Sequence, residues 1–457
     1  MNQALTDFWK SVKDQEIAVI GIGISNRPLI EYLVRLGARV TACDKRERQD
    51  LGKTAEELES IGVSLCLGEN YLKHLTQKII FKTPGMRYDT PELLSAKANG
   101  AVVTSEMEVF FDVCPSHIIA VTGSDGKTTT TTLIHKMMTA AGYKTWLGGN
   151  IGHPLLSETE QMKPEDWVIL ELSSFQLHTM QKSPEIAVMT NLSPNHLDVH
   201  KDYQEYIDAK KNIFLYQDKN SIFVTNAHNK DTNALIPEAR GKVLTFSSDP
   251  TDHADITFRD DTIYVQDQPF LKRSDILLPG MHNVENYMAA IGAVGSMVSR
   301  NVILEIAKSF GGVAHRIELI RTLHDVRYYN SSIDSSPNRT INTLSVFPEK
   351  VILIAGGKDK GIPYDALGKP LLEHVKYLVL IGATSDKIYE SLKTAAGGKI
   401  PIPVYRAKDY PDAVTRAQAE SQPGDVVLLS PASTSFDLFR NFEERGNLFR
   451  TIVENLK

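Results

Sequence analysis

Ile118-Ile-Ala-Val-Thr122-Gly123-Ser-Asp-Gly-Lys127-Thr-Thr129 is the stretch that decides the fold of the middle of the chain. A β-branched run predicts a strand, a glycine-containing loop follows at once, and the pattern from Thr130 to Ala141 predicts a helix. In such a loop backbone N–H groups close on phosphate and the helix dipole favours the anion, while Lys127 neutralises charge and Thr128 offers a hydroxyl to Mg²⁺. We therefore expect an ATP or GTP site formed by Gly123, Ser124, Asp125, Gly126, Lys127, Thr128 and Thr129.

The loop departs from the general phosphate-binding pattern, because Val121 stands where the first glycine is usual. The alternative is a glycine turn that only caps a helix. We favour the nucleotide site, because strand, loop, Lys-Thr pair and helix coincide.

Composition excludes several classes of protein. The chain has 457 residues with 42% hydrophobic and 23% charged residues, which is ordinary for globular domains. Fifty Lys and Arg against 56 Asp and Glu give a net charge of -6, so a nucleic-acid-binding surface is not expected. The three cysteines stand far apart, no apolar run reaches membrane-spanning length, and residues 1–15 lack a secretory pattern. We expect a cytoplasmic protein without membrane insertion.

Short apolar runs alternate with helical patterns along the whole chain, which predicts the α/β class with parallel sheets. The alternation breaks near residue 105 and again at Gly311-Gly312, so three domains are expected: 1–105, 106–312 and 313–457. The polar region 241–270 carries short alternating runs that predict antiparallel hairpins added to the central sheet. The expected strands are 16–20, 38–43, 64–67, 78–82, 102–103, 118–122, 167–172, 186–190, 221–225, 350–355, 377–381, 404–405 and 426–430.

Candidate metal ligands follow the strands of the central domain. Glu171 ends an apolar strand, where ligands gather in open α/β sheets, and is a candidate Mg²⁺ ligand. His196, Asp198 and His200 suggest zinc, but no fourth ligand has a suitable spacing, and we expect His200 to be a surface loop residue. Lys210 lies on a predicted helix, and its residue type alone indicates a solvated face.

The first domain opens with Gly21-Ile-Gly23-Ile-Ser-Asn26 after a strand, and Asp44 stands near the distance at which a dinucleotide fold places its ribose acid. Alone, this pattern suggests a nicotinamide-dependent oxidoreductase. Asn26 replaces the third glycine of the fingerprint, so the pattern supports a nucleotide of some kind without choosing one.

Taken together, the motifs resemble those of the Mur ligases of peptidoglycan synthesis, over nearly the whole chain. They occur in order as 123–129, Gly148-Gly-Asn150, Glu171-Leu-Ser-Ser-Phe-Gln, 191–198, Gly280-Met-His-Asn283-Val-Glu-Asn286, His315-Arg316 and Ser430-Pro-Ala-Ser-Thr-Ser435-Phe-Asp437. The resemblance is greatest to the D-glutamate-adding branch. It implies a Rossmann-like first domain, a central ATPase-like sheet and a Rossmann-like last domain, in a monomer that uses ATP and Mg²⁺.

The implied reaction adds D-glutamate to UDP-N-acetylmuramoyl-L-alanine through an acyl phosphate. The resemblance makes Lys127, Glu171, His196 and Lys210 catalytic. It adds a second Mg²⁺, beside the one expected at Thr128 and Glu171, that is held by His196 and by a carbamylated Lys210; Lys211 is the neighbouring alternative. Asn283 and Arg316 would meet ATP. The UDP-sugar would meet Ile24, Ser25, Asp44, Lys45, Arg46, Gly85 and Asn150, and D-glutamate would meet Lys360, Ser435 and Phe442.

One segment departs from the family pattern. The chain has Ser331 where an aspartate expected near ATP is usual, and carries Asp334 instead, so either residue could face the nucleotide. The alternatives to the ligase are another Mur-type amino-acid ligase such as the L-alanine-adding enzyme, a folylpolyglutamate synthetase, an NAD-dependent oxidoreductase and a slow nucleotide switch.

Overall fold

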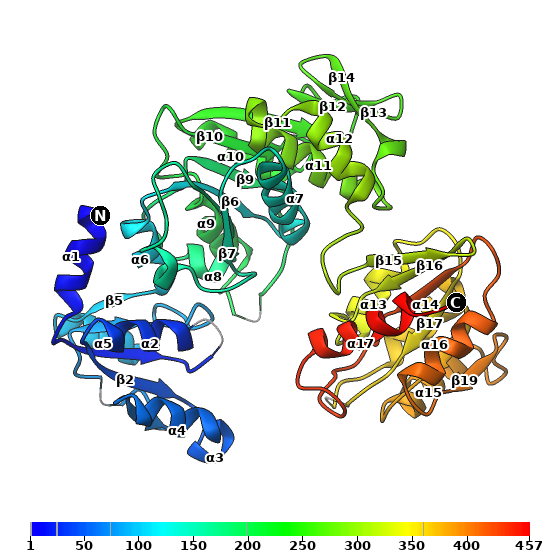
Figure 1. The fold of residues 1–457 in the computed structure, drawn as a ribbon, viewed down its shortest axis with the longest axis horizontal. Helices are drawn as coiled ribbons and strands as arrows, with labels where there is room; N and C mark the ends of the chain where they lie inside the picture. Colours follow the sequence, from blue (N-terminus) through cyan, green and yellow to red (C-terminus); the bar gives the residue numbers. More distant parts are fainter. Residues whose placement is uncertain (1, 24–25, 74, 198, 360) are drawn as a thin grey trace. The chain divides into compact units, whose positions relative to one another are not determined.

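The computed structural model describes residues 2–23, 26–73, 75–197, 199–359 and 361–457. The chain forms two compact units, residues 1–275 with 284–306 and residues 276–283 with 307–457. Three separate sheets follow one another along the chain, which confirms the predicted α/β class (Figure 1). Within these residues, no helix is both long and apolar enough to cross a membrane.

The N-terminal sheet is parallel, with strand order β3-β2-β1-β4-β5. The chain crosses over between β1 and β4, so the loops that follow these two strands open at one crevice, where ligands bind in such sheets. Its elements are α1 (Gln3–Val12), β1 (Glu16–Ile20), α2 (Arg27–Arg35), β2 (Arg39–Asp44), α3 (Arg48–Leu51), α4 (Lys53–Ser60), β3 (Ser64–Leu67), β4 (Ile79–Phe81), α5 (Pro91–Ala98), β5 (Val102–Thr104) and α6 (Glu106–Val113).

The central sheet has the order β14-β13-β12-β11-β10-β9-β6-β8-β7. The strands from β7 to β12 are parallel and β13 and β14 are antiparallel, as expected for region 241–270. Its strands are β6 (His117–Thr122), β7 (Thr145–Gly149), β8 (Trp167–Glu171), β9 (Ile186–Met189), β10 (Ile222–Asn226), β11 (Lys242–Ser247), β12 (Ile256–Arg259), β13 (Thr262–Val265) and β14 (Gln268–Lys272). The helices are α7 (Lys127–Ala140), α8 (Ser174–Leu177), α9 (Tyr203–Lys211), α10 (Lys230–Leu235), α11 (Met281–Val294) and α12 (Arg300–Ser309).

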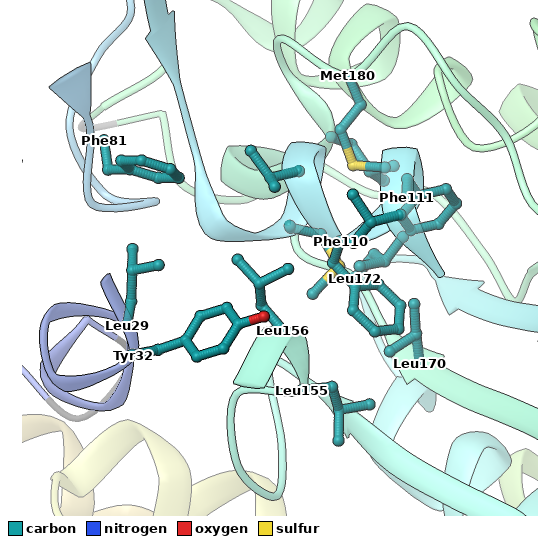
Figure 2. Close-up of a cluster of buried hydrophobic side chains, with 14 of the residues drawn as sticks. Leu29, Tyr32, Phe81, Phe110, Phe111, Leu155, Leu156, Leu170, Leu172 and Met180 are labelled. Atoms are coloured by element: carbon teal, nitrogen blue, oxygen red, sulfur yellow. The ribbon is translucent and has the colours of Figure 1, made fainter. Parts of the chain in front are cut away.

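The N-terminal and central sheets share one hydrophobic core. Leu29 and Tyr32 of α2 belong to the same buried cluster as Phe110 of α6 and Leu155 and Leu156 of the central part. Figure 2 shows Tyr32 reaching from its helix toward Leu156. Since each of these side chains is at most 2% exposed, the first two sheets are joined by apolar packing and do not depend on the connecting chain alone.

The C-terminal sheet has the order β15-β16-β20-β17-β18-β19, with only β15 antiparallel. The hairpin of β15 and β16 is absent from the expected strands. His324 and Asp325 both take positive φ, 50° and 64°, which is the geometry of a tight hairpin turn without a glycine to signal it. The elements are β15 (Glu318–Leu323), β16 (Val326–Asn330), α13 (Pro337–Leu344), β17 (Val351–Ala355), α14 (Gly368–His374), β18 (Val375–Leu380), α15 (Ser385–Ala395), β19 (Val404–Arg406), α16 (Tyr410–Ala419), β20 (Val426–Leu429) and α17 (Phe442–Glu454).

Candidate active site

The phosphate loop, residues 123–129, joins β6 to α7 at the carboxyl edge of the central sheet. Gly123 has φ +145° and a Cβ there would stand 2.0 Å from Thr190 Oγ1. Gly126 is left-handed and caps α7, which begins at Lys127, three residues earlier than the sequence indicates. Lys127 Nζ donates to the carbonyls of Gly123 and Ser124 at 3.0 and 2.8 Å, so the lysine lies along its own loop. The loop has the backbone conformation that a phosphate cradle needs.

Neighbouring elements hold this loop in place. The backbone N–H of Asp125 donates to Asn191 Oδ1 at 2.9 Å, and Ser124 Oγ donates to the Ser193 carbonyl at 3.0 Å. Asn286 Oδ1 accepts from Thr130 Oγ1 at 3.3 Å and would lie 2.3 Å from a Cβ at Gly126. Asn191 and Asn286 lie in the motifs shared with the Mur ligases, but no role was predicted for either side chain. The available signal for a role was their position: Asn191 lies beside the end of a strand, and Asn286 lies near the start of a helix.

Glu171 and Asn150 meet beside the phosphate loop. Glu171 ends β8 in register with Val121 of β6, and its side chain is buried. Asn150 Nδ2 donates to Glu171 Oε1 at 2.7 Å, whereas Oε2 accepts no hydrogen bond from any residue that the structure describes. A buried carboxylate oxygen without a donor is costly unless a cation or proton satisfies it. The geometry of Glu171 therefore fits the predicted role of a Mg²⁺ ligand.

Lys210 is buried against the phosphate loop, so the solvated face indicated by its residue type is wrong. Its side chain is 1% exposed, and Nζ donates to Gly123 O at 2.8 Å and Thr122 Oγ1 at 3.1 Å. Burial, and then the charge of Lys127, lowers the pKa of Lys210 well below its usual range. Lys211, the neighbouring alternative, instead pairs with Glu238 at 2.6 Å. Among the contacts of the described residues, Lys210 reaches the phosphate loop and Lys211 does not.

The two histidines of the loop after β9 differ in environment. His196 is exposed, with φ 54°, and its ring lies 5.2 Å from that of Phe175. His200 is 3% exposed, which contradicts the expected surface position: its ring stacks on Phe175, and Nε2 lies 2.9 Å from Ser174 Oγ. The aromatic side chain of α8 covers it, and nothing in the local sequence signals that tertiary contact. Asp198 lies outside the described residues.

The crevice of the N-terminal sheet brings together part of the predicted UDP site. Asp44 Oδ2 accepts from the backbone N–H of Ile22 at 2.7 Å, and Arg46 donates to both oxygens of Asp44. Burial would raise the pKa of Asp44, but the hydrogen bonds from Arg46 and Ile22 outweigh it and lower the pKa to about 2. Asn26 Nδ2 donates to Ile20 O at 2.8 Å, so this side chain ties the turn where a third glycine is usual.

The remaining predicted contacts of the first domain are less informative. Lys45 and Gly85 are exposed. Ile24 and Ser25 lie outside the described residues.

In the second unit, a buried arginine holds the segment that follows β20. Arg445 is fully buried; Nη1 donates to Ser433 O at 3.0 Å and Nη2 to Ser332 O at 2.8 Å. Ser435 is buried and Phe442, at the start of α17, is half-buried with its ring 6.0 Å from that of His315.

Three further predicted contacts belong to the same unit or fall outside the description. Asn283 Nδ2 donates to Pro279 O at 2.7 Å, and the backbone N–H of Arg316 donates to Val313 O at 3.0 Å. Lys360 lies outside the described residues.

Ser331 and Asp334 are both buried inside the second unit. Asp334 Oδ2 accepts from Thr343 Oγ1 and Ser430 Oγ, each at 2.7 Å, and burial raises the pKa of this carboxyl. Ser331 Oγ accepts from the backbone N–H of Ile317 at 3.3 Å. Asp334 therefore supports the start of the segment 430–437.

Comparisons with known proteins agree along the whole chain. Three family models match: "Mur ligase MurD-like, N-terminal domain" over residues 15–105, "Mur ligase middle domain" over 121–294 and "Mur ligase, glutamate ligase domain" over 315–433. Proteins named UDP-N-acetylmuramoylalanine--D-glutamate ligase from Acetivibrio thermocellus and Ruminiclostridium cellulolyticum are 54% and 52% identical, covering 100% of both chains in each comparison.

Solved structures share the fold at low identity. UDP-N-acetylmuramate-alanine ligase from Thermotoga maritima is 18% identical with a TM-score of 0.58, covering 97% of this chain and 100% of that one. MurF from Acinetobacter baumannii is 15% identical with a TM-score of 0.59, covering 98% and 92%. With the three sheets and the phosphate loop, these matches establish that the chain belongs to the Mur ligase family.

Proposed function

We propose that this protein is an ATP-dependent ligase that joins D-glutamate to UDP-N-acetylmuramoyl-L-alanine and releases ADP and phosphate, in the synthesis of peptidoglycan precursors. The full-length relatives above carry that activity in their names. In the structure, the observation that carries the proposal is the convergence of the phosphate loop, the unsatisfied oxygen of Glu171 and the buried amine of Lys210. Such a site suits transfer of a phosphoryl group to an acid.

The reaction must bring two anions together, the carboxylate of the substrate and the triphosphate of ATP. The substrate carboxylate attacks the γ-phosphorus of ATP, and the bond between this phosphorus and the β,γ-bridging oxygen breaks. ADP departs, and the substrate is now an acyl phosphate. The amine of D-glutamate then attacks the acyl carbon, loses a proton and expels phosphate as the amide forms. Backbone N–H groups of residues 123–129 and the ammonium of Lys127 neutralise the triphosphate, so that the carboxylate can approach in line.

Thr128 and Glu171 would hold one Mg²⁺, and His196 and Lys210 would hold a second. The burial of Lys210 supports a carbamate there, because a neutral amine can react with CO₂ and the product is an anionic oxygen ligand. Bound Mg²⁺ would neutralise the phosphate oxygens as charge moves between them. Glu171 is already oriented by Asn150, and Lys210 by its hydrogen bonds to Thr122 at the end of β6 and to Gly123 of the loop.

The other substrate contacts are proposed from the family resemblance. The hydroxyl and cationic groups named for D-glutamate suit its two carboxylates. We propose a cytoplasmic monomer whose UDP-sugar contacts are Ile24, Ser25, Asp44, Lys45, Arg46, Gly85 and Asn150, whose ATP contacts are residues 123–129, Asn283 and Arg316, and whose D-glutamate contacts are Lys360, Ser435 and Phe442.

Phosphate release from ATP with UDP-N-acetylmuramoyl-L-alanine, measured across a panel of amino acids, tests the proposal. We expect release only with D-glutamate. A response to L-alanine with UDP-N-acetylmuramate would identify the L-alanine-adding activity instead, and release without any amino acid would indicate a nucleotide switch.

A further inference from the structure

Arg87 uses its whole guanidinium group at the contact between the N-terminal and central sheets. Nε and Nη2 donate to the two oxygens of Asp89 at 2.8 and 2.9 Å. Nη1 donates to Val199 O at 2.7 Å and to Glu205 Oε2 at 3.0 Å, and Nη2 donates to Glu205 Oε1 at 3.0 Å. These five hydrogen bonds match the five N–H groups that an arginine carries.

Apart from Asp89 on its own loop, the partners of Arg87 belong to the two segments that carry proposed metal ligands. Val199 lies three residues after His196 on the same loop, and Glu205 lies on α9, which also carries Lys210. Arg87 itself follows β4, two residues after Gly85, on a loop proposed to face the UDP-sugar. One side chain thus connects the sugar-binding loop of the first sheet to both metal-binding segments of the second.

The contact between Arg87 and Glu205 is partly shielded from water and strongly hydrogen-bonded. Glu205 is 14% exposed and Arg87 26%, so water screens this pair less than it screens a surface pair. The hydrogen bonds from Arg87 lower the pKa of Glu205 to about 2. On the same side of α9, the ring of Tyr88 meets that of His178 edge-on at 4.7 Å, and His178 Nε2 lies 3.9 Å from Glu205 Oε1.

A metal ion is the obvious competing occupant of this cluster. His178, His200 and Glu205 bring three ligand atoms within 4.8 Å of one another. Both oxygens of Glu205, however, already accept from Arg87, and a guanidinium beside the carboxylate opposes a second cation by charge. Arg87, with the Lys201 ammonium 3.9 Å from Glu205 Oε1, therefore supplies the positive charge in this place.

We propose that Arg87 is a positioning residue of the ligase, which acts through Glu205 and Val199 to fix the sugar-binding loop relative to the segments that carry His196 and Lys210. The inference rests on the proposed function. A carboxylate delivered from one sheet must meet a phosphorus held by the other, and a misplacement of about 1 Å can cost on the order of a hundredfold in rate. A lysine at position 87 keeps the positive charge but cannot make a bidentate contact with a carboxylate.

Kinetics and hydrogen exchange of Arg87→Lys in the full chain test this role. We expect kcat for D-glutamate-dependent phosphate release to fall about tenfold to a hundredfold. The dissociation constant of ATP, measured without the sugar substrate, should stay within about twofold of the wild type. Backbone amides in peptides covering 196–211 should exchange faster than in the wild type. Glu205→Gln should give the same pattern, and the double variant should lose less than the product of the two single losses.

Arg35 and Glu160 provide the matched control. They also pair across the first two sheets, at 3.4 Å, but on the surface, with side chains 62% and 39% exposed. Arg35→Lys and Glu160→Gln should leave kcat and exchange in 196–211 unchanged. Unchanged kcat in Arg87→Lys, or equal losses in Arg35→Lys, would overturn the inference. A wild type without D-glutamate-dependent turnover would refute the proposed function, and the exchange measurement would still decide whether Arg87 orders residues 196–211.

Discussion

Replacing Lys210 by methionine should separate activity from stability. The change removes two hydrogen bonds, which contribute roughly 1 kcal/mol each. It leaves no polar atom stranded: Gly123 O still accepts from Lys127, and Thr122 Oγ1 still donates to Leu172 O. It also removes the cost of burying an amine, which is several kcal/mol when the group is charged. We therefore expect the free energy of unfolding to change by less than about 2 kcal/mol, with either sign.

Activity should respond very differently. If Lys210 provides a ligand for charge stabilisation, Lys210→Met should lower kcat at least about a hundredfold. Lys211→Met is the matched control, because Lys211 makes an ion pair with Glu238 away from the loop, and it should keep kcat within about threefold.

Tryptophan fluorescence in urea gives the stability of the relevant unit, because Trp9, Trp146 and Trp167 all lie in the first compact unit. Phosphate release gives kcat for the same preparations. Retained turnover in Lys210→Met would refute the assigned role. A loss of turnover explained by unfolding in buffer, or an equal loss in Lys211→Met, would refute the reasoning about burial.

The remaining predictions concern four other positions. Lys127→Ala should abolish amide formation and weaken ATP binding more than tenfold in a titration, because the phosphate loop loses its cation; retained ligation would contradict the nucleotide site. Gly149→Ala should lower turnover more than tenfold, since its Cβ would stand 2.2 Å from Glu171 O at φ +92°, displacing Glu171 and Asn150; unchanged kinetics would show that the Glu171 geometry is unimportant. Arg445→Met should destabilise the second unit by about 3 to 5 kcal/mol and raise KM for D-glutamate. Near-ultraviolet circular dichroism in urea would measure the stability, and steady-state kinetics would measure KM. Arg440→Met is the control, because Arg440 is an exposed arginine of the same segment. Burial raises the pKa of Glu106 to about 7, so the folded chain holds a proton that the unfolded chain releases near pH 4.5. Stability should therefore fall as pH rises between these values, by up to about 3 kcal/mol, and Glu106→Gln should flatten this slope in urea unfolding at pH 5 and pH 8.

The features predicted well from sequence are those fixed by local chemistry. The β-branched run before Gly123, the glycine loop and the helix behind it depend on neighbouring residues, so strand, loop and helix follow in the expected order, with the helix beginning three residues early at Lys127. The same holds for Glu171 at a strand end and for the antiparallel strands of region 241–270, whose alternating pattern is visible in the chain. The family resemblance then adds Lys210, which the residue pattern would have left in solvent.

The features missed depend on contacts between distant segments. His200, in a loop, is buried because rings from two helices pack on it: Phe175 of α8 stacks on its ring and Tyr206 of α9 meets it edge-on. The hairpin of β15 and β16 turns through His324 and Asp325, which carry no glycine signal. Arg87 gave no signal either, since an isolated arginine after a strand is usually solvated, and its five hydrogen bonds go to three residues in different places in the chain. The domain boundaries and the individual substrate contacts stay predictions.

The shared core of the first two sheets limits how this chain can be recombined with its relatives. Leu155 and Leu156 fit the surface of α2 around Leu29 and Tyr32. A hybrid that imports the N-terminal domain of a relative by cutting near residue 105 would set unrelated side chains against those leucines. Engineers exchanging the N-terminal domain should therefore transplant the segment around residues 155–156 together with residues 1–105, or redesign both faces at once.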